Sequence, residues 1–309
     1  MFSSLRRTTD GWITFGLFSV AVVFAIPAHA VQARPKCCVW RVTNAKAPFY
    51  LVGSVHTLNE DDYPLPAPYE IALKDAKRLL FEFDPTRQAE FEKKLNAAAR
   101  YRPGENIRSK IDPKLFAWLQ QNISTVKGDA RRGKKSQATG FNGGLGYKPW
   151  WIAQHLADKN AYSSVSACPG LDDYFLVHAQ KKGKEIGGLE SVDEHVAVLG
   201  GLSDRDGEIL LRDALTPQKN GEAELNRMRK AWRKGDTAAL WAGDARFRRE
   251  APSIAARFVD ERNRKWMPRI EVELKSGKPA AIVAGALHFS GPNSIVRLLE
   301  KRGYKIEQL

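Results

Sequence analysis

The sequence predicts an α/β fold with a central, mostly parallel sheet flanked by helices, in one domain with a helix-rich middle. Two observations carry this prediction. Short apolar runs alternate with helical patterns near both ends of the chain, as they do in βαβ units. Residues 221–275 show helical patterns and little β signal. In such folds the chemistry lies at the carboxyl ends of parallel strands, on the loops that lead into helices.

The beginning of the chain is typical of an export signal. Two arginines precede an apolar stretch that ends at Ile26, and residues 28–30 (Ala-His-Ala) form a small-x-small cleavage site. An uncleaved membrane anchor is the alternative, but the stretch is short for a span of about 20 residues. We therefore expect residues 1–30 to be a signal peptide and residues 31–309 to be the folded domain. The mature protein is then periplasmic or secreted, with no stable transmembrane span.

The composition is that of a globular protein, with 27% charged and 43% hydrophobic residues. The net charge of +14 is large enough to suggest binding to nucleic acid or to an anionic surface. Export argues against nucleic acid, and the charge is spread along the chain apart from a dense block within residues 127–148. We interpret it as a solvated surface, with contact to anionic lipid or polysaccharide as the alternative.

The three cysteines are Cys37, Cys38 and Cys168. Adjacent cysteines pair with each other only with strain, so one of the first two could bridge to Cys168 in an oxidising compartment. Because no Cys-x-x-Cys spacing occurs, a cysteine-based metal site is not expected.

The first half of the chain predicts a hairpin followed by a βαβ crossover. Runs at 38–42 and 48–52 form the hairpin, and a helix over 69–77 leads to a strand over 79–83. The segment 59–68 is acidic and proline-rich, and we expect a loop over the site. Helices are then expected over 88–100, 115–121, 149–159 and 171–181, with a mobile loop over 127–148.

The second half predicts a strand over 185–190 and a strand over 280–284, separated by helices. The expected helices cover 194–199, 208–215 and 258–274. A helix over 294–302 and a strand over 304–309 end the chain, with Gly303 as the helix C-cap.

Two Gly-x-x-His tetrads are the most informative feature. The first ends at His56 and the second at His288, and each follows a strand-like run. Histidine is the usual general base near neutral pH and suits Zn, Mn, Co, Ni or Fe as a ligand. The glycine lets a neighbouring backbone or a ligand approach closely. A structural role is the alternative for either histidine alone, whereas the shared context favours a joint site.

Two carboxylates lie at the ends of further strands. Glu82 interrupts the apolar run 79–83, and burial in a central strand would require a partner or a bound cation. Strand alternation places Asp84 on the same side as Glu82. Glu190 ends the strand predicted over 185–190. The alternatives are an edge strand with Glu82 in solvent, and a helix N-cap or first-turn position for Glu190.

Polar residues also lie on the helix predicted over 258–274. Asn263 falls on its apolar face, where a polar side chain needs a partner. Either Asn263 bonds a loop, or Asn263 and Arg262 reach the site and orient a ligand. His155, His178 and His195 also lie in helical patterns, where we expect surface or half-buried positions.

A series of short motifs runs in order along the chain: Cys38–Val42, Tyr50–His56, Leu80–Asp84, Lys148–Trp150, Gly170–Asp172, Gly188–Val192, Glu261–Met267, Val283–Gly291 and Leu298–Tyr304. In order and spacing this series resembles the TraB/GumN family, which is related to the Tiki metalloproteases. The resemblance implies a fold of the erythromycin esterase and ChaN-like group, with a site built from both halves of the chain. Tiki-like members are described as divalent-metal-dependent peptidases, ChaN-like relatives bind haem, and GumN is named after a polysaccharide gene cluster.

The resemblance also implies roles for individual residues. His56, Glu82 and His288 match the signature positions of the family. Arg262 and Asn263 match its Arg-Asn pair, which would hold an oxyanion or support the ligands.

The resulting hypothesis is an exported, metal-dependent hydrolase, with a peptidase favoured and the peptide or small-molecule substrate left open. A divalent Mn, Co or Zn ion would be bound by His56, Glu82 and His288. Glu190 matches the family's second acidic motif and would act as general base or as a further ligand. The alternatives are a non-enzymatic envelope protein that binds haem, a metal or a glycan, and an accessory protein that binds an anionic polymer. The sequence leaves the oligomeric state open.

Overall fold

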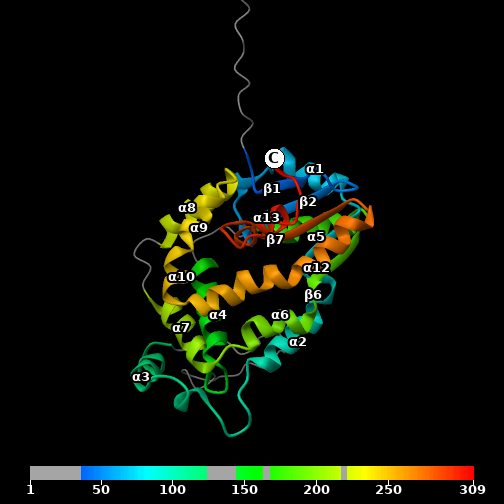
Figure 1. Ribbon diagram of the computed structural model, residues 1–309. Coiled ribbons are helices and arrows are strands. Elements are labelled where there is room, and N and C mark those ends of the chain that lie inside the picture. Colours follow the sequence, from blue (N-terminus) through cyan, green and yellow to red (C-terminus); the bar gives the residue numbers. More distant parts are fainter. Residues whose placement is uncertain (1–35, 124–143, 163–167, 217–220) are drawn as a thin grey trace, which may run out of the picture. The chain divides into compact units, whose positions relative to one another are not determined.

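Four parallel strands, β6, β4, β7 and β2, form one side of a six-stranded sheet with the order β6-β4-β7-β2-β1-β8. β1 pairs antiparallel with both β2 and β8. The computed structural model describes residues 36–123, 144–162, 168–216 and 221–309 (Figure 1). The predicted fold class, an α/β domain with a mostly parallel sheet flanked by helices, is confirmed.

The strands are β1 (Val39–Val42), β2 (Phe49–Ser54), β3 (Thr57–Leu58), β4 (Arg78–Phe83), β5 (Cys168–Pro169), β6 (Glu185–Glu190), β7 (Ala280–Gly285) and β8 (Ile306–Gln308). The helices are α1 (Ala67–Asp75), α2 (Gln88–Ala98), α3 (Pro113–Asn122), α4 (Pro149–Tyr162), α5 (Leu171–Lys181), α6 (Val192–Gly200), α7 (Asp204–Leu215), α8 (Gly221–Arg233), α9 (Thr237–Gly243), α10 (Ala245–Glu250), α11 (Pro252–Ala255), α12 (Glu261–Ser276) and α13 (Ile295–Glu300). Short turns that bear on the site are η1 (Glu60–Asp62), η2 (Pro85–Arg87), the π-helical turn η6 (Ala256–Asp260) and η7 (Ala286–Phe289).

β2 and β7 consist mainly of apolar residues, and helices cover both faces of the sheet. Every residue of β2 is buried, and β7 is buried except at its last residue. α1 and α5 pack together on the sheet, and α12 and α13 form the other layer. In Figure 1, the long orange helix α12 crosses in front of the sheet and α5 lies behind it. α12 ends at Gly277, whose φ of +72° suits the left-handed cap conformation.

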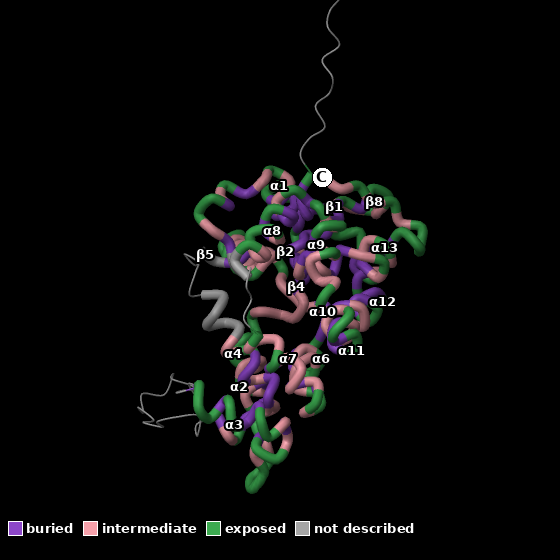
Figure 2. The backbone as a smooth tube through the Cα atoms, turned by 90° about the vertical axis from the view of Figure 1, so that its left-hand side faces the viewer, coloured by how far each residue is buried: buried purple, intermediate pink, exposed green. Residues whose placement is uncertain are grey.

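A second apolar cluster lies beyond the carboxyl ends of the strands. α2, α3, α4, α6 and α7 supply it, with Phe116, Trp150 and Leu211 among its buried members. The sheet and its covering helices form the first cluster. Figure 2 shows the two buried regions as separate purple areas, one around β1 and β2 and one around α2 and α4. The strand ends therefore lie between two packed bodies of side chains.

The predicted hairpin is confirmed, since β1 pairs antiparallel with β2. β2, α1 and β4 form the expected crossover, but β7, from the other end of the chain, lies between β2 and β4. α1 begins two residues before the predicted start because Pro68 lies in its first turn, where the missing N–H costs no hydrogen bond. Sequence analysis did not predict the two-residue strands β3 and β5, which pair with each other.

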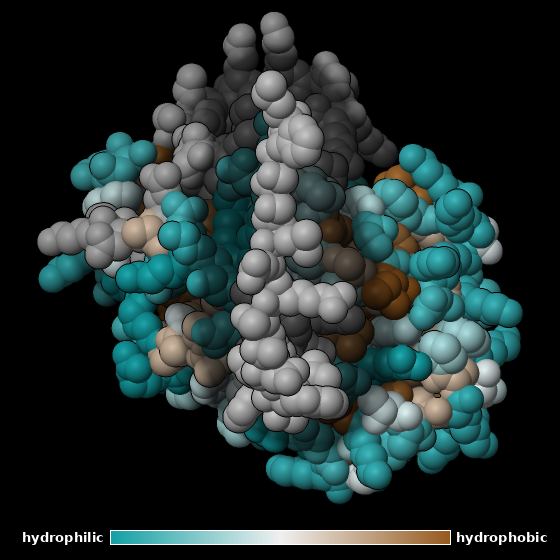
Figure 3. Space-filling model, turned by 90° about the horizontal axis from the view of Figure 1, so that it is seen from above, coloured by the Kyte–Doolittle hydropathy of each residue, from teal (hydrophilic) through white to brown (hydrophobic). Residues whose placement is uncertain are grey.

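Several predictions fall wholly or partly outside the described residues: the signal peptide 1–30, most of the basic loop 127–148, and the side chain of Cys168. Cys37 and Cys38 carry free, buried thiols. Within the described ranges, no helix combines the length and apolar character needed to cross a membrane. The face seen in Figure 3 is mostly hydrophilic, with apolar residues in small separate patches.

Candidate functional site

The carboxyl edge of the four parallel strands brings the two tetrads together. β2 and β7 are neighbours, and Ser54 of the first tetrad is the register partner of Gly285, the first residue of the second. β4 lies on the other side of β7 and β6 lies beyond it. Glu190, Glu82, His288 and His56 therefore follow or end adjacent strands, as the sequence pattern predicted for strand-end residues.

Glu82 is held in an interior strand by three separate groups. The N–H of Gly285 donates to its Oε1 at 2.9 Å, and Nη2 of Arg262 donates to its Oε2 at 2.7 Å. Nε2 of His288 lies 3.6 Å from Oε1. Burial would raise the pKa of Glu82, but Arg262, His288 and the Gly285 N–H outweigh burial and hold the pKa well below its usual range. The edge-strand alternative is wrong, because β4 is an interior strand, and Glu82 is an ionised carboxylate whose side chain is 18% exposed.

Asp84, two residues further on, does not join this group. Its Oδ1 accepts hydrogen bonds from the backbone N–H and the hydroxyl of Thr86, at 2.9 and 2.6 Å. Strand alternation no longer applies there because the chain turns into η2, and the carboxylate caps that turn.

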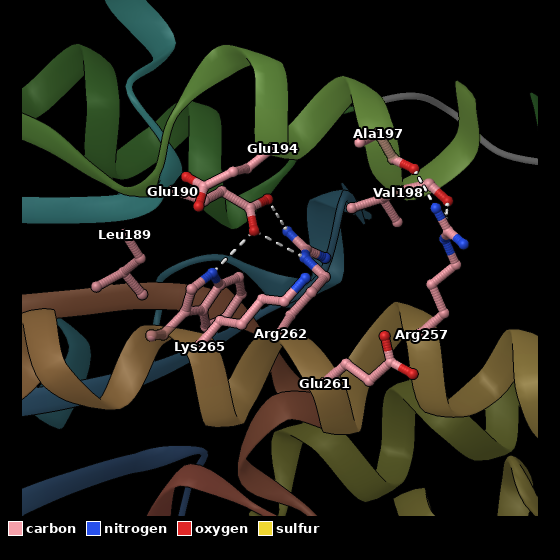
Figure 4. A pocket seen from close by; sticks show the side chains of 10 residues that line it. Leu189, Glu190, Glu194, Ala197, Val198, Arg257, Glu261, Arg262 and Lys265 are labelled. Atoms are coloured by element: carbon pink, nitrogen blue, oxygen red, sulfur yellow. Dashed lines mark hydrogen bonds and ion pairs between the residues drawn. The ribbon is translucent and has the colours of Figure 1, made fainter. Parts of the chain in front are cut away.

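Glu190 and Arg262 form a two-pronged ion pair. Nε and Nη2 of Arg262 donate to Oε2 and Oε1 of Glu190, at 3.2 and 2.6 Å. Figure 4 shows the two side chains pointing toward each other between α6 and α12. Trp266 donates its indole N–H to Oε2 of Glu190 at 2.9 Å. The N-cap of α6 is Ser191, so the N-cap alternative for Glu190 is wrong.

Arg262 joins both acidic strand ends through one guanidinium. Since Nη2 reaches Glu82 and Glu190, a single positive charge is shared by two carboxylates. Nη1 donates to the carbonyl of Phe258, at 3.3 Å, within the π-helical turn that precedes α12. Arg262 and Glu190 are buried, and the three side chains keep a net negative charge, which favours a nearby cation.

Asn263 fixes the orientation of His288. Its amide donates to the carbonyls of His288 and Asn293, at 3.1 and 2.9 Å. Its Oδ1 lies 2.6 Å from Nδ1 of His288. Because an amide oxygen only accepts, Nδ1 of His288 carries the hydrogen and Nε2 is left bare in the neutral ring. Asn263 therefore bonds the loop, as the first alternative predicts, and it also contacts the ring of His288.

The environment of His288 favours this neutral form. Only 5% of its side chain is exposed, and its ring packs on Trp266 with the ring centres 4.5 Å apart. Burial lowers the pKa of His288 to about 4, although Glu82 partly opposes the shift. A bare Nε2 thus faces a carboxylate oxygen, and these two acceptors attract only if a proton or a cation lies between them.

His56 lies in the opposite environment, with 81% of its side chain exposed. Its Nδ1 is 3.2 Å from Oδ2 of Asp172, at the start of α5. The nearby carboxylate of Asp172 raises the pKa of His56 to about 9. The backbone of Gly170 packs on the backbone of His56 so closely that a Cβ on Gly170 would lie 2.4 Å from the carbonyl oxygen of His56.

His195 is the site residue that sequence analysis missed. Its Nδ1 lies 2.5 Å from Oε1 of Glu190, and its ring stacks on Phe83 with centres 4.4 Å apart. The expected half-buried position is correct, but the contact with Glu190 was not foreseen. A sequence pattern could have indicated this contact: an acidic residue at the strand end is followed by a capping box, and the first turn of the capped helix then lies over the strand end. His155 and His178 bond carbonyls of their own helices, Trp151 and Tyr174.

The described residues contain no group of three or more histidine, cysteine, aspartate or glutamate side chains arranged to hold a metal ion. Two of the three expected ligands, Glu82 and His288, face each other. The third, His56, lies after the neighbouring strand with its imidazole turned to Asp172.

A family model described as TraB/PrgY/gumN matches residues 38–308, nearly the whole described chain. Neither the curated proteins nor the solved structures provide a match to this chain.

Proposed function

Because this chain belongs to the TraB/PrgY/gumN family, we propose that it is an exported, metal-dependent hydrolase that favours peptide substrates. The site lies at the carboxyl ends of β2, β4, β6 and β7. The export part of the proposal is supported by the arginine pair, apolar stretch and Ala-His-Ala sequence of the first 30 residues.

One observation carries the proposal: Nε2 of His288 faces Oε1 of Glu82 at 3.6 Å, and both are hydrogen-bond acceptors. Two ligands bound at about 2.1 Å to one tetrahedral ion lie roughly 3.4 Å apart. The separation of the two atoms is therefore suited to a shared divalent ion such as Mn, Co or Zn. The net negative charge of the Glu82, Glu190 and Arg262 group also favours a cation.

His56 would complete the ligand set from the adjacent strand. Its side chain is exposed, so its imidazole can leave Asp172 without breaking a packed contact. A divalent ion held by these residues would polarise a scissile carbonyl and lower the pKa of water, as in other metal-dependent hydrolases.

The chain's other residues would position these groups. Asn263 keeps Nε2 of His288 free of hydrogen, and the Gly285 N–H with Arg262 keeps Glu82 ionised. Both oxygens of Glu190 are already hydrogen-bonded, so we assign it the positioning of Arg262 in place of the general-base role.

Metal content of the exported protein, purified without chelators, tests the proposal. Elemental mass spectrometry should find close to one divalent ion per chain, and His288→Ala and His56→Ala should each lose it. His178→Ala is the matched control, because Nδ1 of His178 only bonds the carbonyl of Tyr174 in its own helix. Cleavage of a mixture of quenched fluorescent peptides should follow metal content.

A wild-type protein without metal after reloading with Mn, Co and Zn would contradict the proposal. A Soret absorbance band on addition of haem would then support the binding-protein alternative. Metal without cleavage of any peptide would keep the metal site and reject the peptidase assignment.

A further inference from the structure

An apolar cavity of about 450 Å³ lies beside Arg262, between the helices of the second cluster. Its walls come from α2, α4, α6 and α7 and from the turn before α12, and its main apolar residues are Phe91, Leu95, Trp150, Leu210, Ala214 and Phe258. Cavities of roughly 300–1,000 Å³ with apolar walls and a few polar groups are typical small-molecule sites.

The cavity and the strand-end site share one side chain. Arg262 lines the cavity and also donates to Glu82, which faces His288. A group bound in the cavity would therefore lie one side chain away from Glu82.

Each charged side chain in the lining already has a partner. Arg262 is paired with Glu82 and Glu190, and Asp213 is paired with Arg246 at 2.9 Å. A charged ligand group would lose its hydration without gaining an unpaired partner, whereas a neutral apolar group would gain by burial.

His195 gives the cavity a hydrogen-bonding group. Its Nδ1 lies 2.5 Å from Oε1 of Glu190. Two acceptors would repel at that distance, so Nδ1 carries the hydrogen and Nε2 of the neutral ring is an acceptor. Among the described residues Nε2 has no hydrogen-bond partner. The ring of Phe83 stacks on the imidazole, and the ring of Phe91 packs against it at a tilt.

We infer that this cavity binds a bulky, neutral aromatic group of the substrate, and that Nε2 of His195 accepts a hydrogen bond from that group. That the aromatic group belongs to a substrate rests on the proposed hydrolase function, whereas binding in the cavity does not. An indole or phenol side chain has the required ring and N–H or O–H donor, so a peptide with tryptophan or tyrosine next to the scissile bond is the preferred substrate class.

Binding of indole and of 1-methylindole tests the inference without metal or turnover. The two probes have similar rings, but only indole has an N–H donor. Calorimetric titration of the full chain, with a chelator present, should show indole binding at least threefold more tightly than 1-methylindole. His195→Phe keeps the stacked ring and should make the two affinities equal.

Filling the cavity should prevent binding of both probes. Ala214→Trp places an indole inside the cavity from half-buried α7 and should weaken both affinities at least tenfold; Leu210→Trp is a second variant if the first unfolds. Ala242→Trp is the matched control, because Ala242 is an exposed alanine on α9 that lines a different cavity. Circular dichroism checks the fold of each variant.

Three results would overturn the inference. They are no indole binding to the wild type up to the solubility limit, equal losses in Ala214→Trp and Ala242→Trp, and equal wild-type affinities for the two probes. Because no metal is present, failure here is distinct from failure of the proposed function, which is decided by metal content and peptide cleavage.

Discussion

The same tetrad occurs twice on neighbouring strands, yet its two histidines have opposite environments. His288 is 5% exposed, is held by Asn263 and has a pKa lowered to about 4. His56 is 81% exposed, faces Asp172 and has a pKa raised to about 9. The tetrad therefore determines where a histidine lies on the sheet, and the helices packed against it determine the proton that the ring carries.

The difference comes from which layer covers each loop. α12 passes over the loop after β7 and supplies Arg262 and Asn263 from consecutive positions. Among the described residues, the loop after β2 is covered where α5 begins, by Asp172 and by the N-cap residue Gly170. The loop after β7 is mostly buried, and the loop after β2 leaves its imidazole in solvent. This asymmetry is suited to a site with one fixed ligand and one that can move.

Removing Arg262 should have the largest effect on stability, because Arg262 pairs with both Glu82 and Glu190 on the side of the site that contains His288. Arg262→Met leaves Glu82 and Glu190 buried without a counter-charge, and we expect the free energy of unfolding to fall by about 3–5 kcal/mol. Urea unfolding measures it. Arg257→Met is the matched control: Arg257 donates only to the carbonyls of Val198 and Ala197, and about 1 kcal/mol should be lost. Equal losses would show that the carboxylates relax into solvent.

In the metal-free protein, the two histidines should change the free energy of unfolding in opposite directions as the pH rises. For His288 the folded pKa of about 4 lies below the unfolded value of about 6.5, so the unfolded chain gains a proton first and stability falls as pH drops below 6.5, by up to roughly 3 kcal/mol. For His56 the folded pKa is about 9, so its contribution is complete below pH 6.5 and is lost as pH rises through 9.

The contribution of His56 should be small, because solvent screens its exposed ring. Urea unfolding between pH 5 and 9, with a chelator present, separates the two. His288→Gln should reduce the pH dependence of stability below pH 6.5, and His56→Gln should reduce it near pH 9. Because the pKa values of Glu82 and Glu190 are lowered, the stability that these carboxylates contribute is lost only below this pH range. If both variants change the same side, the assigned environments are wrong.

Replacing Asn263 should lower the free energy of unfolding by less than replacing Arg262, because Asn263 is neutral. Asn263→Leu keeps the volume but leaves the carbonyls of His288 and Asn293 without a donor, and should cost about 2–3 kcal/mol in urea unfolding. It also removes the acceptor for Nδ1 of His288, so nitrogen NMR of the ring should show mixed tautomers where the wild type shows one. A single tautomer in the variant would mean that Glu82 alone sets it.

The parts of this arrangement that sequence could predict are local. Continuous apolar runs mark strands that are buried on both faces, and for this reason β2, β4 and β7 and the residues at their ends were identified. The burial of Asn263 followed from its place on an apolar helical face.

The parts that sequence could not predict depend on contacts between distant segments. Nothing local shows that β7 lies between β2 and β4, or that Asp172 faces His56. Asp84 was expected beside Glu82 because alternation was extended one residue past the strand end. The contact of His195 with Glu190 depends on how the chain turns from β6 into α6, which spacing alone does not give.

The smallest expected effect on stability is the difference between alanine substitutions at the two tetrad glycines. A Cβ on Gly53 would lie 3.0 Å from Cβ of Cys38 and 3.3 Å from Cα of Ala286, so Gly53→Ala must move packed backbone and should cost about 1–3 kcal/mol. On Gly285, at a φ of −50°, a Cβ would make ordinary contacts of 3.5 Å with Glu82 and 3.7 Å with His288, so Gly285→Ala should stay within about 0.5 kcal/mol of wild type. Urea unfolding compares them. If Gly285→Ala keeps its stability but loses metal, the second glycine is needed to give a ligand access and not for packing, and the two tetrads differ in this respect as well.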